Sequence, residues 1–484
     1  MNEVKDRNII KSFFQFSAGP WISAIISFFT TPIITWLIIP EEFGKASMYT
    51  VAFSLIMQIS LLGTDQSFVR MFYEYEEKKR PTLLWNSLIT SFGLSIVISF
   101  ILLIFRNEVS HLLFGEPKYL FPVLLLVITI ILGILERFAS LVLRMKKRGL
   151  AFSSLRIINA SANAGGVILY AFLFGRNFYA IIFGKVIGLA LTLVVSVLLE
   201  LDFWQKGFYL SKSLIKKVVL YGLPFVPAFI IAWLFNSMDK LALRSFSSFE
   251  EIGLYTAGNK IVSILMLIQA GFSTFWAPVA YENYENTPED SSLYSKVSKL
   301  LAAFMFSVAL LVIAFKDLII LLLAKAYLPA ANIMPFLIFN PIMYTVSETT
   351  VVGINFKKKT HWHLWISVLA AGTNFVGNTL LVPIYGAKGA AISTGISYIV
   401  FFYARTLISK KLYPVDYNLK RFTAGVLTLI FVAFLNTFGE NTAIEVGSAA
   451  LGFSVVLILY HKEIKYIFGL VKQIINSIRN RIAN

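Results

Sequence analysis

Residues 12–39 read SFFQFSAGPWISAIISFFTTPIITWLII, and no charged side chain interrupts this run. A helix of about 20 apolar residues crosses the hydrocarbon core of a bilayer, so the run is long enough to span it. Residues 1–11, which precede it, are polar and mixed in charge, and no small-residue cleavage site follows it. We therefore expect a retained first transmembrane helix rather than a secretory signal.

The composition of the whole chain supports a membrane environment. Of the 484 residues, 57% are hydrophobic and only 14% are charged, against about 45–50% and 25% in soluble domains. The mean hydropathy is +0.74. So few charges cannot cover the surface of a soluble protein of this size, so the chain is predicted to be a polytopic membrane protein. Because cysteine is absent, disulfides, thiolate metal sites and cysteine nucleophiles are excluded.

The distribution of apolar runs predicts an all-α fold with about 14 transmembrane helices. The expected cores are residues 12–39, 45–69, 82–105, 119–143, 152–174, 178–200, 215–237, 252–280, 295–315, 330–356, 362–382, 387–408, 421–438 and 443–460. The apolar segment 317–326 is too short to span, so we expect it at the outer surface.

Lysine and arginine gather in alternate loops, which orients the chain with both termini in the cytoplasm. The basic clusters are residues 78–80, 144–148, 206–217, 357–359, 410–421 and the tail 462–481. The net charge of +17 is therefore explained by cytoplasmic loops that face anionic lipid, and no nucleic-acid partner is expected.

The two halves of the chain resemble each other at a nearly constant offset. Glu41-Glu42-Phe43-Gly44 matches Glu250-Glu251-Ile252-Gly253, and the matches of Asn163 with Asn374 and of Gly184 with Gly395 have almost the same spacing. Each copy would hold six spans, so both copies have the same orientation and are related by an axis along the membrane normal. This repeat predicts two lobes around a central cleft, although a duplication with no functional meaning would leave the same pattern.

The predicted organisation follows from this repeat. Residues 1–205 form an N-terminal lobe, residues 206–415 a C-terminal lobe, and residues 416–484 two additional helices with a basic cytoplasmic tail. Proline interrupts the first span of each lobe, at Pro20 and Pro32 and at Pro224 and Pro227. These prolines are interpreted either as bending points for alternating access or as packing features.

Cationic side chains inside the spans are the main candidates for substrate binding, because a charge there is costly unless it meets water, a partner or a substrate. Lys260 lies about 12 Å into its span and shares a helix face with Thr256, Asn259 and Ser263. Arg156 and Asn163 form a second polar face, and Lys185 lies inside Gly184-Lys185-x-x-Gly188. For Arg156, snorkelling to the interface is the alternative. Cations that line a wet cleft favour an anionic substrate such as a lipid phosphate.

Acidic side chains inside the spans are candidates for ion coupling or gating. They are Asp65, Glu136, Asp239 and Glu348. The first three have a basic residue nearby in sequence, namely Arg70, Arg137 and Lys240, which indicates structural ion pairs as readily as proton or sodium sites. Glu348 has no such neighbour.

No cofactor is expected. Gly253 to Lys260 resembles a P-loop only superficially, because the lysine is one position late and no serine or threonine follows it. His361 and His363 lack a nearby carboxylate, so we expect no metal site.

A membrane-embedded enzyme, such as a polysaccharide polymerase or acyltransferase, is the rival class, and the internal repeat argues against it.

Three stretches carry a family resemblance: Asp239-Lys240, Glu251-Ile-Gly-Leu-Tyr-Thr-Ala-Gly-Asn-Lys260, and Pro383-Ile-Tyr-Gly-Ala-Lys-Gly-Ala-Ala-Ile-Ser-Thr394. They resemble Wzx-type polysaccharide flippases of the O-antigen or teichuronic-acid kind. These belong to the multidrug/oligosaccharidyl-lipid/polysaccharide exporter superfamily.

This resemblance implies a flippase, not an enzyme, in the bacterial cytoplasmic membrane. It would move an undecaprenyl-pyrophosphate-linked oligosaccharide by alternating access, driven by H⁺ or Na⁺, with polysaccharide polymerase or assembly proteins as partners. In this interpretation Arg156, Lys185 and Lys260 bind the pyrophosphate, and Asn163, Asn259 and Asn374 contact sugar or phosphate.

Two alternatives within the superfamily are lipid II flippases and multidrug exporters. Lipid II flippases have several arginines in their first two spans, whereas here Arg70 stands only at the edge of span 2. Multidrug exporters have about twelve spans and acidic cavities. Both differences favour the Wzx-like interpretation.

Overall fold

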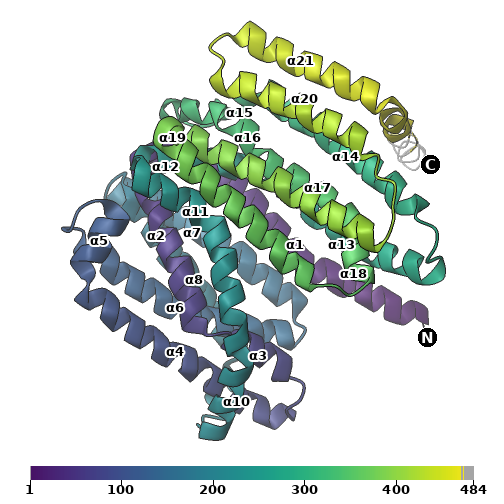
Figure 1. Ribbon diagram of the computed structural model, residues 1–484. Helices are drawn as coiled ribbons and strands as arrows, with labels where there is room; N and C mark the ends of the chain where they lie inside the picture. The colour runs from purple at the N-terminus through teal and green to yellow at the C-terminus, as the bar shows by residue number, and fades with distance from the viewer. Residues whose placement is uncertain (1, 470–472, 474–484) are drawn as a thin grey trace, which may run out of the picture. The chain divides into compact units, whose positions relative to one another are not determined.

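A computed structural model describes residues 2–469 and residue 473 (Figure 1). Residues 470–472 and 474–484, the last part of the predicted basic tail, lie outside the described residues. Every regular element within residues 2–469 is helical, which confirms the all-α prediction. The described chain divides into two compact units.

The first unit comprises residues 1–244 and 248–253. Its elements are α1 (Asn2–Leu37), α2 (Pro40–Leu61), α3 (Thr64–Met71), η1 (Glu77–Lys79), α4 (Arg80–Ile104), α5 (Arg106–Phe114), α6 (Leu120–Met145), α7 (Gly149–Leu173), α8 (Phe178–Leu198), α9 (Leu201–Gln205), α10 (Lys212–Gly222), η2 (Leu223–Phe225) and α11 (Val226–Phe246).

The second unit comprises residues 245–247 and the chain from Leu254 onward. Its elements are α12 (Phe249–Val262, whose first turn belongs to the first unit), α13 (Leu265–Asn286), α14 (Ser292–Ala314), α15 (Lys316–Ile320), η3 (Lys325–Asn332), α16 (Met334–Leu337), α17 (Phe339–Thr350), α18 (Val352–Phe356), α19 (His361–Leu412), α20 (Leu419–Phe438) and α21 (Thr442–Leu459).

The boundary between the compact units differs from the predicted lobe boundary at residues 205 and 206. Helix α10 packs against α3 and α4 of the first unit, and Trp233 of α11 donates a hydrogen bond to the Val51 carbonyl of α2. The seventh predicted span therefore belongs to the first unit by its contacts. The assignment of residues to two repeated lobes and a C-terminal pair stays a prediction.

Most of the predicted spans coincide with long helices. Within the described residues, nine helices are long and apolar enough to cross a membrane, or up to twelve if each bent pair is one span. The short elements α15 and η3 occupy the region of segment 317–326, which was expected not to span. The exact number of fourteen stays a prediction.

Helix α19 accounts for two predicted spans. It has 52 residues, which is about 78 Å at 1.5 Å per residue, more than twice the thickness of a hydrocarbon core. Gly386 interrupts it with φ 54° and ψ −130°. Such a backbone conformation is accessible to glycine but strained for other residues. The interruption lies between the predicted cores 362–382 and 387–408.

The sharp bends do not lie at the prolines that the sequence singled out. Helix α1 is continuous through Pro20 and Pro32, and Pro224 lies in the short 3₁₀ turn η2. Within the described residues, the three breaks above 40° separate α2 from α3 by 52°, α12 from α13 by 43°, and η3 from the helical stretch Met334–Thr350 by 52°. Whether the prolines act as bending points for alternating access or as packing features therefore stays a prediction.

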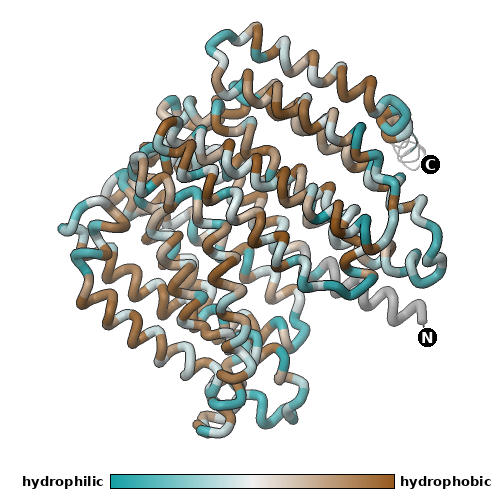
Figure 2. Tube along the Cα trace, viewed as in Figure 1, coloured by the Kyte–Doolittle hydropathy of each residue, from teal (hydrophilic) through white to brown (hydrophobic). Residues whose placement is uncertain are grey.

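The outer surface of the helices suits a hydrocarbon solvent. Large apolar side chains are widely exposed, with Phe172 at 68% and Ile458 at 74%. In Figure 2, hydrophobic residues follow the lengths of the helices and hydrophilic residues gather at helix ends and loops. Exposure on this scale marks lipid contact in a membrane protein, since a soluble chain rarely leaves large apolar patches uncovered.

Each unit has its own core. In the first unit Phe68, Phe72 and Phe138 pack among the leucines of α4 and α6. In the second unit Trp276, Tyr294 and several aromatic side chains near Phe356 form a buried cluster. Helices α20 and α21 lie side by side and both contact α14.

Two repeated glycines make a reciprocal contact inside the first unit. A Cβ atom on Gly44 would lie 1.8 Å from the carbonyl oxygen of Phe249, and one on Gly253 would lie 1.9 Å from the carbonyl oxygen of Pro40. These are the equivalent glycines of the repeated Glu-Glu-x-Gly motif. The motif therefore serves close backbone packing at the start of α2 and α12.

Replacing Gly44 with alanine is expected to lower the melting temperature of the detergent-solubilised protein. The added methyl group cannot fit without moving a helix end, and overpacking costs about 1–3 kcal/mol. Gly93→Ala is the matched control, because nothing lies within 4 Å of a Cβ atom at that position. Equal melting temperatures for the two variants would contradict the close contact.

Candidate functional site

A cavity of about 350 Å³ lies between α2 and α11 of the first unit. Its lining residues are Thr50, Val51, Ser54, Gln58, Phe229, Ala232, Trp233, Asn236, Ser237 and Lys240. The lining combines hydroxyl and amide groups with one ammonium group. Polar groups on this scale are uncommon on transmembrane helices unless they face water or a ligand.

Helical periodicity explains why these residues share one cavity. Thr50, Ser54 and Gln58 are spaced by four residues along α2, so they lie one above the other on one face. Trp233, Asn236 and Lys240 follow at spacings of three and four along α11. Each helix therefore presents a polar stripe, and the two stripes line the cavity.

Trp233 fixes the two helices against each other. Its indole nitrogen donates to the Val51 carbonyl oxygen at 3.2 Å and to Ser54 Oγ at 3.0 Å. The side-chain amide of Asn236 donates to the Ala232 carbonyl oxygen at 2.7 Å. These bonds hold the cavity wall in a defined geometry, which lowers the cost of ordering it around a ligand.

A second ammonium group lies close to the cavity. Lys185 Nζ of α8 stands 3.7 Å from the ring centroid of Phe53, on α2, and Lys185 and Lys240 are near enough to repel each other. Lys185 lies about 10 Å along α8 from Phe178, and Lys240 about 9 Å along α11 from Phe246. Asp239 supplies an opposing charge beside Lys240.

Close packing of α8 on α7 directs Lys185 toward α2. A Cβ atom on Gly184 would lie 2.6 Å from the Asn163 carbonyl oxygen, and one on Gly188 would lie 3.1 Å from the Asn159 carbonyl oxygen. The small-residue face of α8 therefore meets α7, as in other membrane helix pairs. Lys185 leaves the helix on a different face and meets Phe53.

This arrangement is suited to an anionic, hydroxyl-rich ligand. Two ammonium groups attract phosphate oxygens by charge-assisted hydrogen bonds, and the hydroxyl and amide groups match sugar hydroxyls. A volume of about 350 Å³ is at the lower end of ligand pockets. It is enough for a diphosphate with part of one sugar.

Two predicted binding residues lie on α7, outside this cavity lining. Arg156 is exposed, and its guanidinium lies 5.3 Å from the ring centroid of Phe152. Asn163 is half-buried, with its carbonyl oxygen at the contact with Gly184. Their role in binding stays a prediction.

Asp65 does not pair with Arg70, contrary to one of the sequence interpretations. Its Oδ2 atom accepts hydrogen bonds from Arg137 at 3.1 Å and 2.7 Å, whereas Arg70 pairs with Glu74 at 2.7 Å. Glu136 lies within electrostatic range of Arg137 and Arg156. Three of these charged groups come from α6 and α7, and Asp65 comes from α3, so the four form a charged network inside the first unit.

In the second unit, the predicted polar face around Lys260 is only partly exposed. Lys260 and Ser263 are exposed and Asn259 is half-buried, but Thr256 is buried. Helix α12 ends at Val262, so Lys260 lies in its last turn, directly before the 43° bend.

Asn374 is 2% exposed and takes part in a buried network. Its side-chain amide donates to Thr394 Oγ1 at 3.3 Å and its carbonyl oxygen accepts from Asn378 at 3.0 Å. This network joins the two halves of α19. Substrate contact by Asn374 would require the network to open.

Glu348 has a cationic partner that sequence proximity did not indicate. Its Oε1 atom accepts a hydrogen bond from Arg405 Nη1 at 2.8 Å, and its Oε2 atom accepts one from Ser273 at 3.3 Å. Arg405 also donates to Ser347 Oγ at 2.6 Å. Glu348 therefore links α13, α17 and α19.

The family comparison agrees with this geometry. The family described as polysaccharide biosynthesis protein matches residues 9–283, which is more than half of the chain, so the protein belongs to that family. An uncharacterized membrane protein of Methanocaldococcus jannaschii is 22% identical over 464 residues, which cover 89% of this chain and 90% of the relative.

Solved structures show the same fold. The inward closed conformation of the lipid II flippase MurJ superposes with a TM-score of 0.69 at 15% identity, covering 94% of this chain and 99% of that one. An inward-facing multidrug resistance MATE family transporter of the MOP superfamily gives 0.59 at 14% identity, covering 84% and 94%. A mutant of the MATE transporter VcmN of Vibrio cholerae gives 0.56 at 16% identity, covering 84% and 97%.

The chain therefore belongs to the polysaccharide biosynthesis protein family and shares its fold with the lipid II flippase MurJ and with MATE transporters. The family match and the shared fold agree with the resemblance found in the sequence. The transported molecule is a separate question, and the site geometry is the guide to it.

Proposed function

We propose that the protein flips an undecaprenyl-pyrophosphate-linked oligosaccharide from the inner to the outer leaflet of a bacterial cytoplasmic membrane. Transport proceeds by alternating access, with both termini in the cytoplasm, and an H⁺ or Na⁺ gradient drives it. Polysaccharide polymerase or assembly proteins receive the product.

The observation that carries this proposal is Lys240 in the lining of a polar cavity of the first unit, with Lys185 of α8 close to it. A lysine inside a span costs about 2.5–3.5 kcal/mol on insertion scales, and two such groups near each other also repel. An anionic ligand removes both penalties at once. A diphosphate has the charge and the oxygen acceptors for two ammonium groups.

The other predicted residues have defined places in this proposal. Arg156 and Lys260 are exposed and offer further positive charge to the diphosphate along its path. Asn163 and Asn259 are half-buried and offer amide groups to sugar hydroxyls. Asn374 contacts sugar only in a conformation in which its bonds to Thr394 and Asn378 are broken.

Asp65 is the acidic group best placed for ion coupling. Arg137 binds its Oδ2 atom, while its Oδ1 atom is buried and has no hydrogen-bond partner among the described residues. A buried carboxylate oxygen without a partner is costly, and a proton or a sodium ion would satisfy it. Glu136, Asp239 and Glu348 remain the other candidates.

Replacing Asp65 with asparagine is expected to abolish the stimulation of flipping by an imposed ion gradient. The amide oxygen still accepts from Arg137, but the side chain can no longer exchange a proton or balance a sodium charge. Flipping by proteoliposomes is measured with and without the gradient. Glu348→Gln is the comparison variant, and a gradient response in Asp65→Asn equal to that of the wild type would remove Asp65 from coupling.

The substrate is tested in proteoliposomes that contain the purified protein and a fluorescent lipid-linked glycan. An external quencher reaches a labelled lipid of the inner leaflet only after that lipid has moved to the outer leaflet. The proposal therefore expects rapid loss of this fluorescence with the protein and slow loss in protein-free vesicles. Equal rates in both preparations would contradict the proposal.

Lipid II is the second candidate substrate, because a lipid II flippase has the same fold over nearly the whole chain. Against it, residues 12–69 contain no arginine. The same assay with lipid II in place of the oligosaccharide lipid separates the two.

Dye efflux tests the multidrug alternative, and glycan elongation by the purified chain tests the enzyme alternative.

A further inference from the structure

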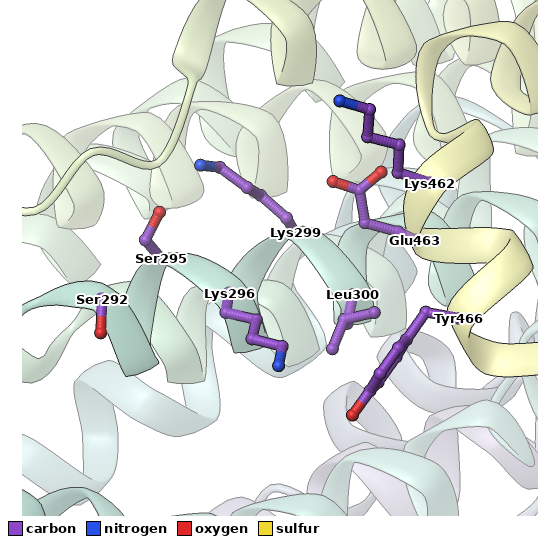
Figure 3. Close-up of a pocket in the computed structure, with 8 residues that line it drawn as sticks. All are labelled: Ser292, Ser295, Lys296, Lys299, Leu300, Lys462, Glu463 and Tyr466. Carbon is purple, nitrogen blue, oxygen red and sulfur yellow. The ribbon is translucent and has the colours of Figure 1, made fainter. Parts of the chain in front are cut away.

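A second cavity, of about 440 Å³, lies in the second unit between the start of α14 and residues 461–469, which are helical. Figure 3 shows its eight lining residues. They are Ser292, Ser295, Lys296, Lys299 and Leu300 of α14 and Lys462, Glu463 and Tyr466 of the segment after α21. We call this cavity the terminal pocket.

The terminal pocket has an excess of positive charge. Glu463 accepts hydrogen bonds from both terminal nitrogens of Arg421. Burial alone would raise the pKa of this carboxyl, but the bonds from Arg421 lower it below its usual value. Glu463 is therefore ionised, and Arg421 balances its charge. Among the described residues, no ion pair within 4 Å involves Lys296 or Lys462.

The third lysine is only weakly engaged. Lys299 Nζ lies 3.9 Å from Asp416 Oδ2, and 81% of the Asp416 side chain is exposed. Helix α14 begins at this pocket, and its positive dipole end already faces the Asp290 carboxylate, which accepts a hydrogen bond from the Ser292 backbone N–H at 2.9 Å. The pocket thus offers three lysines to an anion, whereas the Ser295 hydroxyl already donates to the Asp416 carbonyl oxygen.

The apolar side of the terminal pocket indicates a membrane-water interface. Leu300 and Tyr466 line it, Lys296 Nζ lies 4.9 Å from the ring centroid of Tyr466, and Phe468 is 70% exposed. Lysines alternate with large apolar residues in the 461–469 segment, as in helices that lie in the headgroup layer. Lys357 belongs to the basic loop 357–359 and donates a hydrogen bond to Tyr284, near the end of α13. The terminal pocket therefore lies at the same end of the unit as this basic loop.

We infer that the terminal pocket binds the phosphodiester headgroup of an anionic glycerophospholipid from the surrounding leaflet. Basic pockets between membrane helices bind such headgroups elsewhere. Here Lys299 and Lys462 contact the phosphate, Lys296 adds positive charge beside Tyr466, and the acyl chains run along Leu300 and Tyr466. This site is separate from the cavity beside Lys240 and does not depend on the proposed substrate.

Native mass spectrometry of the full chain in uncharged detergent tests this inference. Phosphatidylglycerol and phosphatidylcholine with the same acyl chains are titrated separately. The wild type is expected to bind phosphatidylglycerol at least ten-fold more tightly, and the variant K296Q/K299Q/K462Q should lose that preference. K296R/K299R/K462R keeps the charges and should retain it.

The matched control is K357Q/K358Q/K359Q, which removes the same charge from exposed positions at the same end and should bind like the wild type. Unchanged affinity in K296Q/K299Q/K462Q would overturn the inference, and so would an equal loss in the control. A further arm uses sn-glycerol 3-phosphate. If it protects the protein from heat as strongly as phosphatidylglycerol, the pocket is a site for soluble phosphates and the lipid assignment is wrong.

Discussion

A variant in which alanine replaces both Lys185 and Lys240 is expected to flip its lipid-linked substrate roughly a hundred-fold more slowly than the wild type. Each ammonium group makes a charge-assisted hydrogen bond worth about 1.5–3 kcal/mol, and 1.4 kcal/mol is about a factor of ten. Lys240→Ala alone should therefore cost about ten-fold or more. The measurement is the initial flipping rate in proteoliposomes at matched protein content.

Two controls separate binding from folding in this experiment. Lys240→Arg keeps the charge at the cavity and should keep most of the rate. Lys118→Ala removes an exposed lysine that pairs with Glu116 in the same unit, and it should behave like the wild type. A wild-type rate in the double variant would show that the cavity is not on the transport path.

Replacing Lys316 with alanine is expected to cause the largest loss of stability of any single change considered. The Lys316 side chain is 2% exposed, and its Nζ atom lies 2.9 Å from Glu445 Oε2. Asp317 and Asn332 also bind this ammonium group. Removing it leaves the buried Glu445 carboxylate uncompensated, which costs about 3–5 kcal/mol. The melting temperature should fall by roughly 5–10 °C.

The double variant Lys316→Met and Glu445→Gln tests the physical reason. It removes both charges, and neutral replacements of a buried pair are often close to neutral in stability. It should recover most of the lost melting temperature. If Lys316→Ala melted within about a degree of the wild type, the pair would not hold α21 to the rest of the second unit.

The helices could be predicted from the sequence because hydropathy is a local property. An apolar run long enough to cross a bilayer forms a helix whatever its neighbours are, since its backbone must satisfy its own hydrogen bonds in lipid. The exception is instructive: α7 lies at the predicted core 152–174 but is not among the helices apolar enough to qualify by themselves. Its polar residues, such as Arg156 and Asn163, explain this.

The ion pairs of Asp65 and Glu348 could not be predicted from the sequence, because their partners lie on other helices, far away along the chain. Asp65 bonds Arg137, which is 72 residues away, and Glu348 bonds Arg405, which is 57 residues away. Sequence proximity suggested other partners for Asp65 and none for Glu348. Tertiary packing determines these pairs, and tertiary packing cannot be read from a single sequence.

Only part of the cavity could be predicted from the sequence. The position of Lys185 well inside an apolar span predicts a binding role. Lys240 directly follows Asp239 in the sequence, which indicates a structural ion pair as readily as a proton or sodium site. The sequence does contain a periodic signal for the cavity, because each of two spans carries a polar stripe. The stripes are Thr50, Ser54 and Gln58 on one span, and Trp233, Asn236 and Lys240 on the other. Two polar stripes on separate spans indicate a shared wet surface, although their pairing requires the structure.

The absence of native cysteine allows a direct test of the central claim that the cavity beside Lys240 holds a lipid diphosphate. A single cysteine is introduced as Gln58→Cys, and its rate of modification by a charged, membrane-impermeant thiol reagent is measured in proteoliposomes. The account predicts that the residue reacts and that undecaprenyl diphosphate slows the reaction at least five-fold, whereas undecaprenol does not. A residue that never reacts, or one whose rate the diphosphate leaves unchanged, would contradict it.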